Sequence, residues 1–247
     1  MSAPADAGAA SPRLTHLGDA ALILSFGERI APEIHARVMD ARAALPALPG
    51  VTDVVPGYST LTVHFDPLRL PHARVAAALE AAAQAPPRKS ALAGRWSVPV
   101  CFDTEFGQDL ESVAALTGRA PAAIAEALCA LELDVYLIGF LPGFPYLGEL
   151  PEWLRLPRKD TPRTAVPAGS VAIAGAQAAI YPWTSPGGWH LLGRTPLRLF
   201  DATHAERPAM FAPGDRLRFR AVGRAEFDQL AAAIDAGELA PDAFRGA

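Results

Sequence analysis

Three short blocks in the second half of this 247-residue chain carry the side chains best suited to chemistry. The first block places Arg158, Lys159 and Arg163 within six positions. A guanidinium group can donate two parallel hydrogen bonds to a carboxylate or a phosphate, so this block is a candidate anion-binding segment. The alternative is a solvent-exposed loop whose arginines pair with acids such as Asp160 and Glu152. The sequence leaves both interpretations open.

The second block combines two glycines with a histidine. Gly187 and Gly188 have no side chain, so their backbone N–H groups can approach an anion or an oxyanion closely. His190 can act as an acid, a base or a hydrogen-bond donor, because its reference pKa lies near neutrality. A histidine beside Trp189 is also typical of a structural hydrogen bond. Arg194 follows at the end of the block.

The third block is a loop rich in glycine, proline and aromatic residues, from Gly139 to Gly148. Its composition predicts a rigid, tightly turned segment that carries Phe140, Phe144 and Tyr146. Together with Trp189, these side chains are expected to form a pocket wall or an exposed surface for a partner. A corner of the aromatic core is the alternative.

These blocks lead to one hypothesis for the site. Cations bracket the uncharged stretch Thr164–Gly193, so an anion held there would meet fixed donors in a partly dry pocket. The catalytic candidates are Arg163 and His190. The candidates for substrate or anion binding are Arg158, Lys159, Gly187, Gly188 and Arg194. In the alternative, Arg163 and Arg194 pair with acids such as Asp160 and Asp201 and only stabilise the fold. The uncharged stretch is also expected to contribute to the partner surface.

The first half of the chain predicts a small α+β domain. Strands are expected over residues 20–26, 51–55 and 60–65, and helices over 32–45 and 71–85. In residues 60–65, apolar and polar side chains alternate, as in a half-buried sheet. The order β-α-β-β-α is compatible with a ferredoxin-like domain if a further strand joins the sheet.

The second half of the chain differs from the first in its residue composition. A strand is expected over residues 96–102, followed by helices over 109–116 and 121–131. Residues 139–196 contain 8 of the 20 glycines and 9 of the 24 prolines, which favours short strands and loops, as in a β-barrel. A strand over 216–222 and a helix over 225–236 follow. The expected domains are a disordered tail (1–13), an α/β domain (14–88), a barrel (94–223) and a C-terminal helix and tail (224–247), with a linker at 86–90.

Composition excludes several classes of protein. Half of the residues are hydrophobic, which is incompatible with a fully disordered chain. The 22 Lys and Arg residues against 26 Asp and Glu residues give a net charge of -4, which argues against binding the nucleic-acid backbone. Cys101 and Cys129 are too far apart in the sequence for zinc-ligand spacing, so we expect no metal site, no disulfide and a cytoplasmic location.

Other common signatures are also missing from the sequence. There is no P-loop, no H-E-x-x-H and no G-x-S-x-G motif. The longest uncharged stretch is broken by Pro167, Pro182 and Pro186, so no membrane span is expected. The residues before Arg13 lack the features of a signal peptide.

The three blocks, in their order, resemble a bacterial family. They read GFLPGFPYLGEL, PRKDTPRTAVPAGSVAIAGAQAAIYP and SPGGWHLLGRTPLRLFD. The family is known as the 5-oxoprolinase B subunit, as allophanate hydrolase subunit 1 or as the sporulation kinase inhibitor KipI. Its earlier blocks are matched by LGDAALILSFG, GVTDVVPGYSTLTVHFDP and VPVCFDTEFGQDLESVAALTG. The resemblance implies an N-terminal α/β domain, ferredoxin-like in our prediction, followed by a C-terminal cyclophilin-like β-barrel.

The resemblance also implies a function within a complex. With a C-type subunit (allophanate hydrolase subunit 2 type) and an A-type subunit, family members form an ATP-dependent hydrolase that opens 5-oxoproline to L-glutamate. ATP with Mg²⁺ would be used at the level of the complex, and the chain alone would be inactive. The alternatives are a carboxyltransferase subunit of urea or allophanate metabolism, which would involve biotin, and a KipI-like inhibitor that binds a histidine kinase. Relatives commonly carry His and Tyr where this chain has Leu128 and Leu133.

Overall fold

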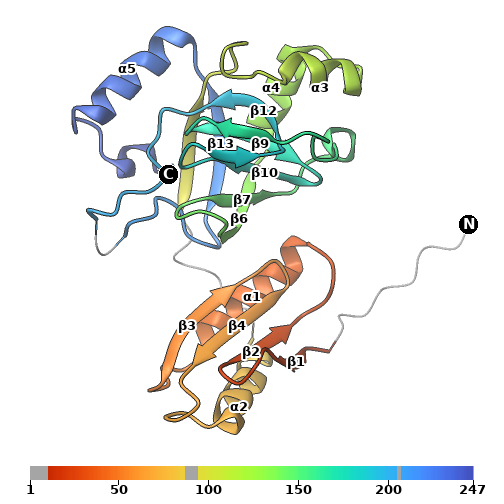
Figure 1. Cartoon of the computed structure of the whole chain (residues 1–247), viewed down its shortest axis with the longest axis vertical. Helices are drawn as coiled ribbons and strands as arrows, with labels where there is room; N and C mark the ends of the chain where they lie inside the picture. The colour runs from red at the N-terminus through yellow and green to blue at the C-terminus, as the bar shows by residue number, and fades with distance from the viewer. Residues whose placement is uncertain (1–10, 87–93, 205–206, 247) are drawn as a thin grey trace, which may run out of the picture. The chain divides into compact units, whose positions relative to one another are not determined.

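A computed structural model of the chain describes residues 11–86, 94–204 and 207–246 (Figure 1). The chain divides into two compact units, Met1–Leu92 and Ala93–Ala247. The expected linker overlaps the segment 87–93, and most of the expected tail overlaps 1–10, so these parts of both predictions lie outside the described residues.

The N-terminal unit is a four-stranded antiparallel sheet with two helices on one face. Its strands are β1 (Arg13–His16), β2 (Ala21–Ser25), β3 (Val51–Pro56) and β4 (Thr60–Phe65), in the order β1-β2-β4-β3. Its helices are α1 (Pro32–Ala44) and α2 (His72–Ala83). Alternate residues of the central strands, such as Leu22 and Val63, pack against Val38 of α1 and Val75 of α2, which explains the period-2 pattern.

The C-terminal unit is built on a seven-stranded sheet. Its strands follow the order β12-β9-β10-β7-β6-β13-β5, and all neighbours are antiparallel except β13 and β5. Their bounds are β5 (Arg95–Val100), β6 (Leu133–Ile138), β7 (Pro145–Gly148), β9 (Ser170–Ala174), β10 (Gln177–Ile180), β12 (His190–Arg194) and β13 (Arg216–Ala221). Cys101, just after β5, exchanges two 2.9 Å backbone hydrogen bonds with Arg194 of β12. This bridge joins the two edges of the sheet, so the barrel is nearly closed.

A two-stranded ribbon and several helices complete this unit. The ribbon pairs β8 (Arg163–Val166) with β11 (Ser185–Gly187). The helices are α3 (Leu110–Thr117), α4 (Pro121–Ala130) and α5 (Arg224–Asp235), with short 3₁₀ turns at Glu152–Leu154 and Pro241–Phe244. In the part of the chain that the structure covers, no single helix is long and apolar enough to cross a membrane. Helices α3 and α4 meet that test only as a pair, and the pair is bent by 93°.

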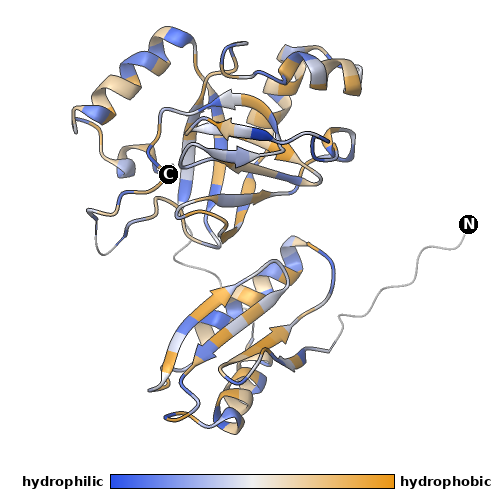
Figure 2. Ribbon diagram, in the orientation of Figure 1, coloured by the Kyte–Doolittle hydropathy of each residue, from blue (hydrophilic) through white to orange (hydrophobic). Residues whose placement is uncertain are grey.

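The two faces of strands β9 and β10 serve different cores, and all residues of these strands except Ser170 and Gln177 are apolar. Figure 2 colours the whole chain by hydropathy. Val171 and Ile173 point into the main core, which also receives Ile124 from α4. The alternating residues Ala172 and Ala174 belong to a second, smaller cluster. Their small side chains leave room for large aromatic rings on that face, which form one wall of the candidate site.

Most of the predicted elements are found within two residues of their expected bounds. Strands β1 and β6 were not predicted, and β1 begins at Arg13, so the expected disordered tail is wrong at that residue. Leu128 and Leu133, which stand where relatives carry His and Tyr, are fully buried in the main core. In this chain both positions therefore contribute to packing.

Candidate functional site

Two of the three cations of the first block converge on one buried carboxylate. Nζ of Lys159 lies 2.8 Å from Oδ1 of Asp109, and Nη2 of Arg163 lies 2.7 Å from the same oxygen. The alternative interpretations of the sequence expected acids such as Asp160, Glu152 or Asp201, and none of these is the partner. Lys159 and Arg163 are therefore already ion-paired within the chain.

Asp109 directly precedes helix α3 and is only 4% exposed. Its Oδ2 accepts a 2.8 Å hydrogen bond from the backbone N–H of Leu191, and its own N–H donates to the Leu191 carbonyl at 2.9 Å. Burial alone would raise the pKa of Asp109, but hydrogen bonds from Arg163, Lys159 and Leu191 outweigh it and lower the pKa from 3.8 to about 2. The group is thus a stable carboxylate at neutral pH.

His190 is the first residue of β12, and its side chain is buried next to Leu191, the residue that Asp109 contacts. Its Nε2 lies 2.9 Å from the carbonyl oxygen of Pro157. Its Nδ1 is also buried, and no described residue forms a hydrogen bond with it. Nη1 of Arg163 is in the same situation, buried and without a partner among the described residues. Buried polar atoms without partners are uncommon, and they often mark sites that receive a ligand or water.

The two glycines of the second block lie against the cations, as the site hypothesis expected of an opposing wall. Gly187 pairs with Arg163 across the β8–β11 ribbon, and the carbonyl of Gly188 accepts a 2.7 Å hydrogen bond from the backbone N–H of Lys159. A Cβ atom at Gly187 would collide with the hydroxyl group of Tyr181. A glycine is therefore required there by the close approach of a buried tyrosine.

An aromatic cluster lies on the same face of the sheet. Phe144 contacts Tyr146, Tyr181 and Trp189, with ring centroids 4.9 to 6.2 Å apart. The guanidinium of Arg158 lies 5.9 Å from the centre of the Trp189 ring. Burial raises the pKa of Tyr181 to about 12, against the opposing charge of Arg158. The tyrosine is therefore a neutral hydroxyl across the whole physiological range.

Of the expectations for these aromatic residues, an exposed partner surface does not fit Phe144 or Trp189, whereas a pocket wall or a corner of the aromatic core does. Phe144 is 2% exposed and Trp189 is 5% exposed, because both pack on the alanine-lined face of the sheet. Phe140 alone projects, at 64% exposure. The uncharged stretch Thr164–Gly193 likewise forms strands β8 to β11 and the start of β12, and most of its apolar side chains are buried. It is an internal part of the barrel and not the broad surface that its composition suggested.

Arg194 does not join the other cations. It lies at the closing bridge of the barrel, with its guanidinium 4.9 Å from the centre of the Phe106 ring. Burial lowers its pKa, and the charge of Glu105 opposes that change. No described contact links it to Asp160, Asp201 or the Asp109 carboxylate. Of the expected site residues, the structure thus brings together Lys159, Arg163, Gly187, Gly188 and His190, with Arg158 nearby over Trp189 and Arg194 apart.

Sequence reasoning missed Asp109 and Tyr181. Asp109 is the first residue of the helix expected over 109–116, which is an ordinary place for an aspartate and carries no sign of a site. The signal that could have revealed it is its partnership with cations about 50 positions away, and only the fold shows that. Tyr181 lies inside the uncharged stretch and carries no local motif.

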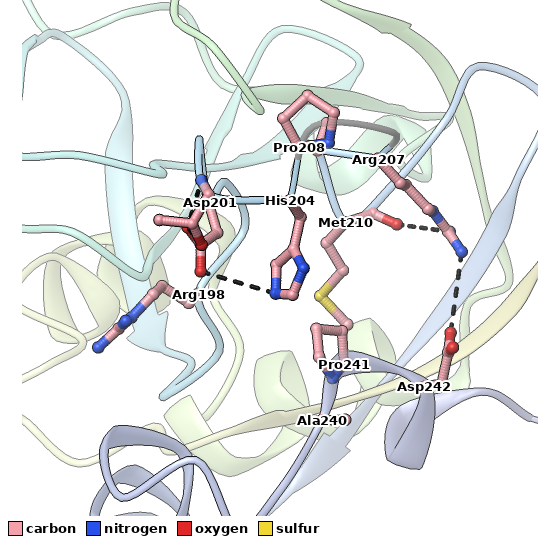
Figure 3. Close-up of a pocket in the computed structure, with 11 residues that line it drawn as sticks. Arg198, Asp201, His204, Arg207, Pro208, Met210, Ala240, Pro241 and Asp242 are labelled. Atoms are coloured by element: carbon pink, nitrogen blue, oxygen red, sulfur yellow. Dashed lines mark hydrogen bonds and ion pairs between the residues drawn. The ribbon is translucent and has the colours of Figure 1, made fainter.

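A cavity of the C-terminal unit lies elsewhere. It measures about 470 Å³ and is lined by residues of the 198–210 segment and the C-terminal 3₁₀ turn (Figure 3). His204 lies 3.8 Å from Asp201, and Arg207 lies 3.8 Å from Asp242 while also donating to the Met210 carbonyl. None of the expected site residues lines this cavity. Its charges are mutually paired, so it gives no sign of an anion site.

The described residues also bear on metal binding. Within residues 11–86, 94–204 and 207–246, no group of three or more His, Cys, Asp or Glu side chains is arranged to hold a metal ion.

Comparison with known proteins identifies the class. Residues 12–211 match the family model described as carboxyltransferase domain, subdomain C and D. The chain belongs to this family.

Two relatives of the chain share a more specific name than that of the family. The chain is 34% identical to the 5-oxoprolinase B subunit of Bacillus subtilis (strain 168) over 228 residues, which cover 87% of this chain and 95% of that protein. It is 37% identical to the protein of the same name from Escherichia coli O157:H7 over 206 residues, covering 82% and 93% of the two chains.

A solved structure supports the fold. The Kluyveromyces lactis urea carboxylase superposes with a TM-score of 0.74 at 17% identity, over 92% of this chain. The chain spans only 23% of that enzyme, so this likeness concerns the fold and not the whole enzyme's activity.

Proposed function

We propose that this chain is the B subunit of a 5-oxoprolinase complex, which opens 5-oxoproline to L-glutamate at the expense of ATP. The observation that carries the proposal is the near-complete alignment with two proteins of that name, at 34% and 37% identity. The chain acts with a C-type and an A-type subunit and is inactive alone. The complex works in the cytoplasm.

The Arg163–His190 site offers the groups that lactam hydrolysis needs. Water adds to the ring carbonyl, the C–N bond breaks, and the nitrogen takes up a proton. The Nδ1 atom of neutral His190 can accept the proton of the attacking water and return it to the departing nitrogen. Nη1 of Arg163 can donate a hydrogen bond to the oxygen that gains negative charge. Both atoms are buried and without partners in the described structure.

The paired cations Lys159 and Arg163 do not fit a nucleoside triphosphate. Asp109 already binds Lys159 and Arg163, so the three groups together carry a net charge of only +1. The sequence also lacks a P-loop. We therefore place ATP and Mg²⁺ on another subunit of the complex and derive no step of this chain through them.

The partner surface, in this proposal, centres on Phe140. This side chain is 64% exposed and is the only non-glycine residue with a positive φ (65°) in the described part of the chain. Gly143, in the same loop, packs against Phe200, whose ring lies 6.1 Å from the exposed Trp183. Exposed aromatic side chains on a subunit of a complex are typical of an interface. The C-type subunit is the proposed occupant.

We also propose the finer description of the two domains. In the N-terminal unit, β2-α1-β3-β4-α2 follows the ferredoxin-like path, and β1 takes the place of the missing last strand beside β2. The joined edges of the seven-stranded sheet support a cyclophilin-like barrel in the C-terminal unit.

The test of the function is reconstitution. The purified chain is mixed with its C-type and A-type subunits, and glutamate is measured after addition of 5-oxoproline and Mg-ATP. The full set should form glutamate, and no single subunit should do so. Turnover by the isolated chain would show that it is not an obligate subunit. A full set that leaves 5-oxoproline unchanged would refute the function itself.

The test of the site uses His190→Ala and Arg163→Lys. Arg163→Ala is unsuitable, because truncation would leave Asp109 with one cation fewer and destabilise the fold. Lysine keeps a charge for Asp109 but loses the second guanidinium nitrogen, so activity of the complex should fall by about 10²- to 10³-fold. Arg218→Lys, at an exposed ion pair with Glu132, is the matched control and should keep full activity. Full turnover by both site variants would place the reaction elsewhere.

A second candidate is a carboxyltransferase subunit in urea or allophanate metabolism. The fold shared with urea carboxylase favours it, although the identity of 17% shows the fold alone. The same reconstitution decides between them, with urea and a biotinylated carrier in place of 5-oxoproline. Carboxyl transfer without glutamate formation would favour this candidate.

A further inference from the structure

The carboxylate of Asp109 connects three segments that are distant in the sequence. Its Oδ1 binds Lys159 and Arg163, which lie 50 and 54 positions away. Its Oδ2 binds the backbone N–H of Leu191, 82 positions away. Leu191 directly follows His190, so one carboxylate fixes two cations and the backbone beside the histidine.

The Asp109 carboxylate does not form the hydrogen bond that its position in the sequence would predict. Asp109 stands at the N-cap of helix α3, where an aspartate ordinarily accepts a hydrogen bond from the backbone of the first helical turn. In this chain the Asp109 side chain makes no such bond. Helix α3 therefore has no hydrogen bond from a capping side chain, and the Asp109 carboxylate binds Lys159 and Arg163 instead. Its orientation is therefore explained by the cations and not by the helix.

The arrangement controls how Arg163 is presented. A guanidinium group is planar, so fixing Nη2 on Asp109 restricts the orientation of the whole group. The remaining Nη1 is buried, and no described residue accepts a hydrogen bond from it. Without the carboxylate, Lys159 and Arg163 would be two adjacent cations that repel each other. Both would then move away from their present positions.

We propose that Asp109 is a positioning residue of the site. It does not touch the substrate; it holds Lys159 and Arg163 so that Nη1 of Arg163 faces the substrate oxygen. This inference rests on the proposed function for its effect on turnover, but the anchoring of Arg163 is measurable without turnover.

The experiment compares Asp109→Asn with Asp215→Asn. Asp215 is the matched control, since it is equally buried and accepts three hydrogen bonds, from Gly94 N, Trp96 Nε1 and Ala212 N. Those groups are not among the candidate site residues. Both variants are assayed in the reconstituted complex, at a temperature where urea titration shows each to be folded. In parallel, side-chain ¹⁵N NMR of the full chain follows the mobility of the Arg163 guanidinium.

A positioning role for Asp109 predicts a specific pattern of results. Asp109→Asn should mobilise the Arg163 guanidinium and lower kcat by about 10- to 100-fold, as misplacement of a catalytic group does. KM should not rise, because the site gains positive charge when the carboxylate is lost. Asp215→Asn should leave the Arg163 signal, kcat and KM unchanged. If Asp109→Asn does not fold, Asp109→Glu keeps the charge but displaces it by one methylene, and it should lower kcat in the same way.

Three results would overturn the inference. The first is an Arg163 guanidinium that stays as ordered in the Asp109 variant as in the wild type. The second is a mobilised Arg163 with unchanged kcat. The third is an equal loss of kcat in the Asp109 and Asp215 variants, which would indicate a general structural effect. A wild-type complex that does not act on 5-oxoproline refutes the proposed function instead. The NMR comparison then still tests whether Asp109 anchors the Arg163 guanidinium.

Discussion

His190 and Pro157 are joined by a 2.9 Å hydrogen bond in which only the histidine can be the donor. A carbonyl oxygen accepts hydrogen bonds and cannot donate them, so Nε2 of His190 must carry the proton. In the neutral imidazole, Nδ1 is then the unprotonated nitrogen with a free lone pair. The backbone of the cation-bearing loop thus selects the tautomer of the candidate base.

The first prediction concerns this tautomer. Long-range ¹H–¹⁵N NMR spectra should show neutral His190 with the proton on Nε2 in nearly all molecules, because the Pro157 carbonyl stabilises that form. His16, which is exposed and whose ring stacks on His72, serves as the internal control and should show a mixture of the two tautomers. A dominant Nδ1–H form of His190 would contradict the geometry and remove the candidate base.

The second prediction is a pH dependence of stability. The pKa of Asp109 is about 2 in the folded chain against 3.8 for the unperturbed group, so its ion pairs stabilise the fold above pH 3.8. That stabilisation is lost as the pH falls from 3.8 toward 2, where the folded-state carboxylate takes up its proton. The shift corresponds to about 2 kcal/mol.

Urea unfolding of the wild type and of Asp109→Asn at several pH values measures this loss. The difference in unfolding free energy between the two proteins should shrink by about 2 kcal/mol between pH 5 and pH 2, because asparagine does not titrate. A difference that is the same at every pH would mean that Asp109 has no lowered pKa in the folded chain.

The sequence predicts most of the helices and strands, but it does not predict which distant residues meet in the folded chain. The alternation of Leu61, Val63 and Phe65 identified a half-buried strand because burial on one face imposes that period. The segment Arg13–His16 contains one apolar residue, Leu14, which packs against the core, and the segment pairs with the edge of β2. A single apolar residue cannot show the period-2 alternation that identifies a strand in the sequence.

The same distinction applies to the site. The local types of Arg163 and His190 pointed to anion and proton chemistry, and the fold does bring both residues to the region of Asp109. Which acid the cations meet depends on the packing of α3 against β12, which no local motif encodes. The burial of Phe144 fits the alternative of an aromatic core corner, but the sequence could not select that alternative, because the burial depends on the small alanines of neighbouring strands.

The third prediction compares two adjacent glycines. In Gly187→Ala the new methyl group would collide with the hydroxyl of Tyr181, whose ring is 1% exposed and cannot move aside. The unfolding free energy should fall by about 1 to 3 kcal/mol. In Gly188→Ala the methyl group would lie 3.5 Å from Cγ of Pro162, an ordinary contact. Its stability should stay within about 0.5 kcal/mol of the wild type. Equal losses in urea titrations of the two variants would show that the Tyr181 contact is not what requires glycine.

The last prediction separates stability from assembly at Phe140. A non-glycine residue at a φ of 65° is strained, by about 1 kcal/mol, and a side chain that is 64% exposed gains little from its edge-to-face contact with the Phe144 ring at 5.4 Å. A residue with both properties is better explained by a contact outside the chain. Phe140→Gly should therefore stabilise the isolated chain by about 1 kcal/mol and raise its Kd for the C-type partner about 10-fold or more.

Leu116→Ala is the control, since Leu116 is 66% exposed on α3, and the binding of this variant to the C-type partner should be unchanged. Urea titration and a binding titration measure the two effects. A Phe140→Gly chain that is more stable and binds the C-type partner as tightly as the wild type would place the interface elsewhere on the molecule.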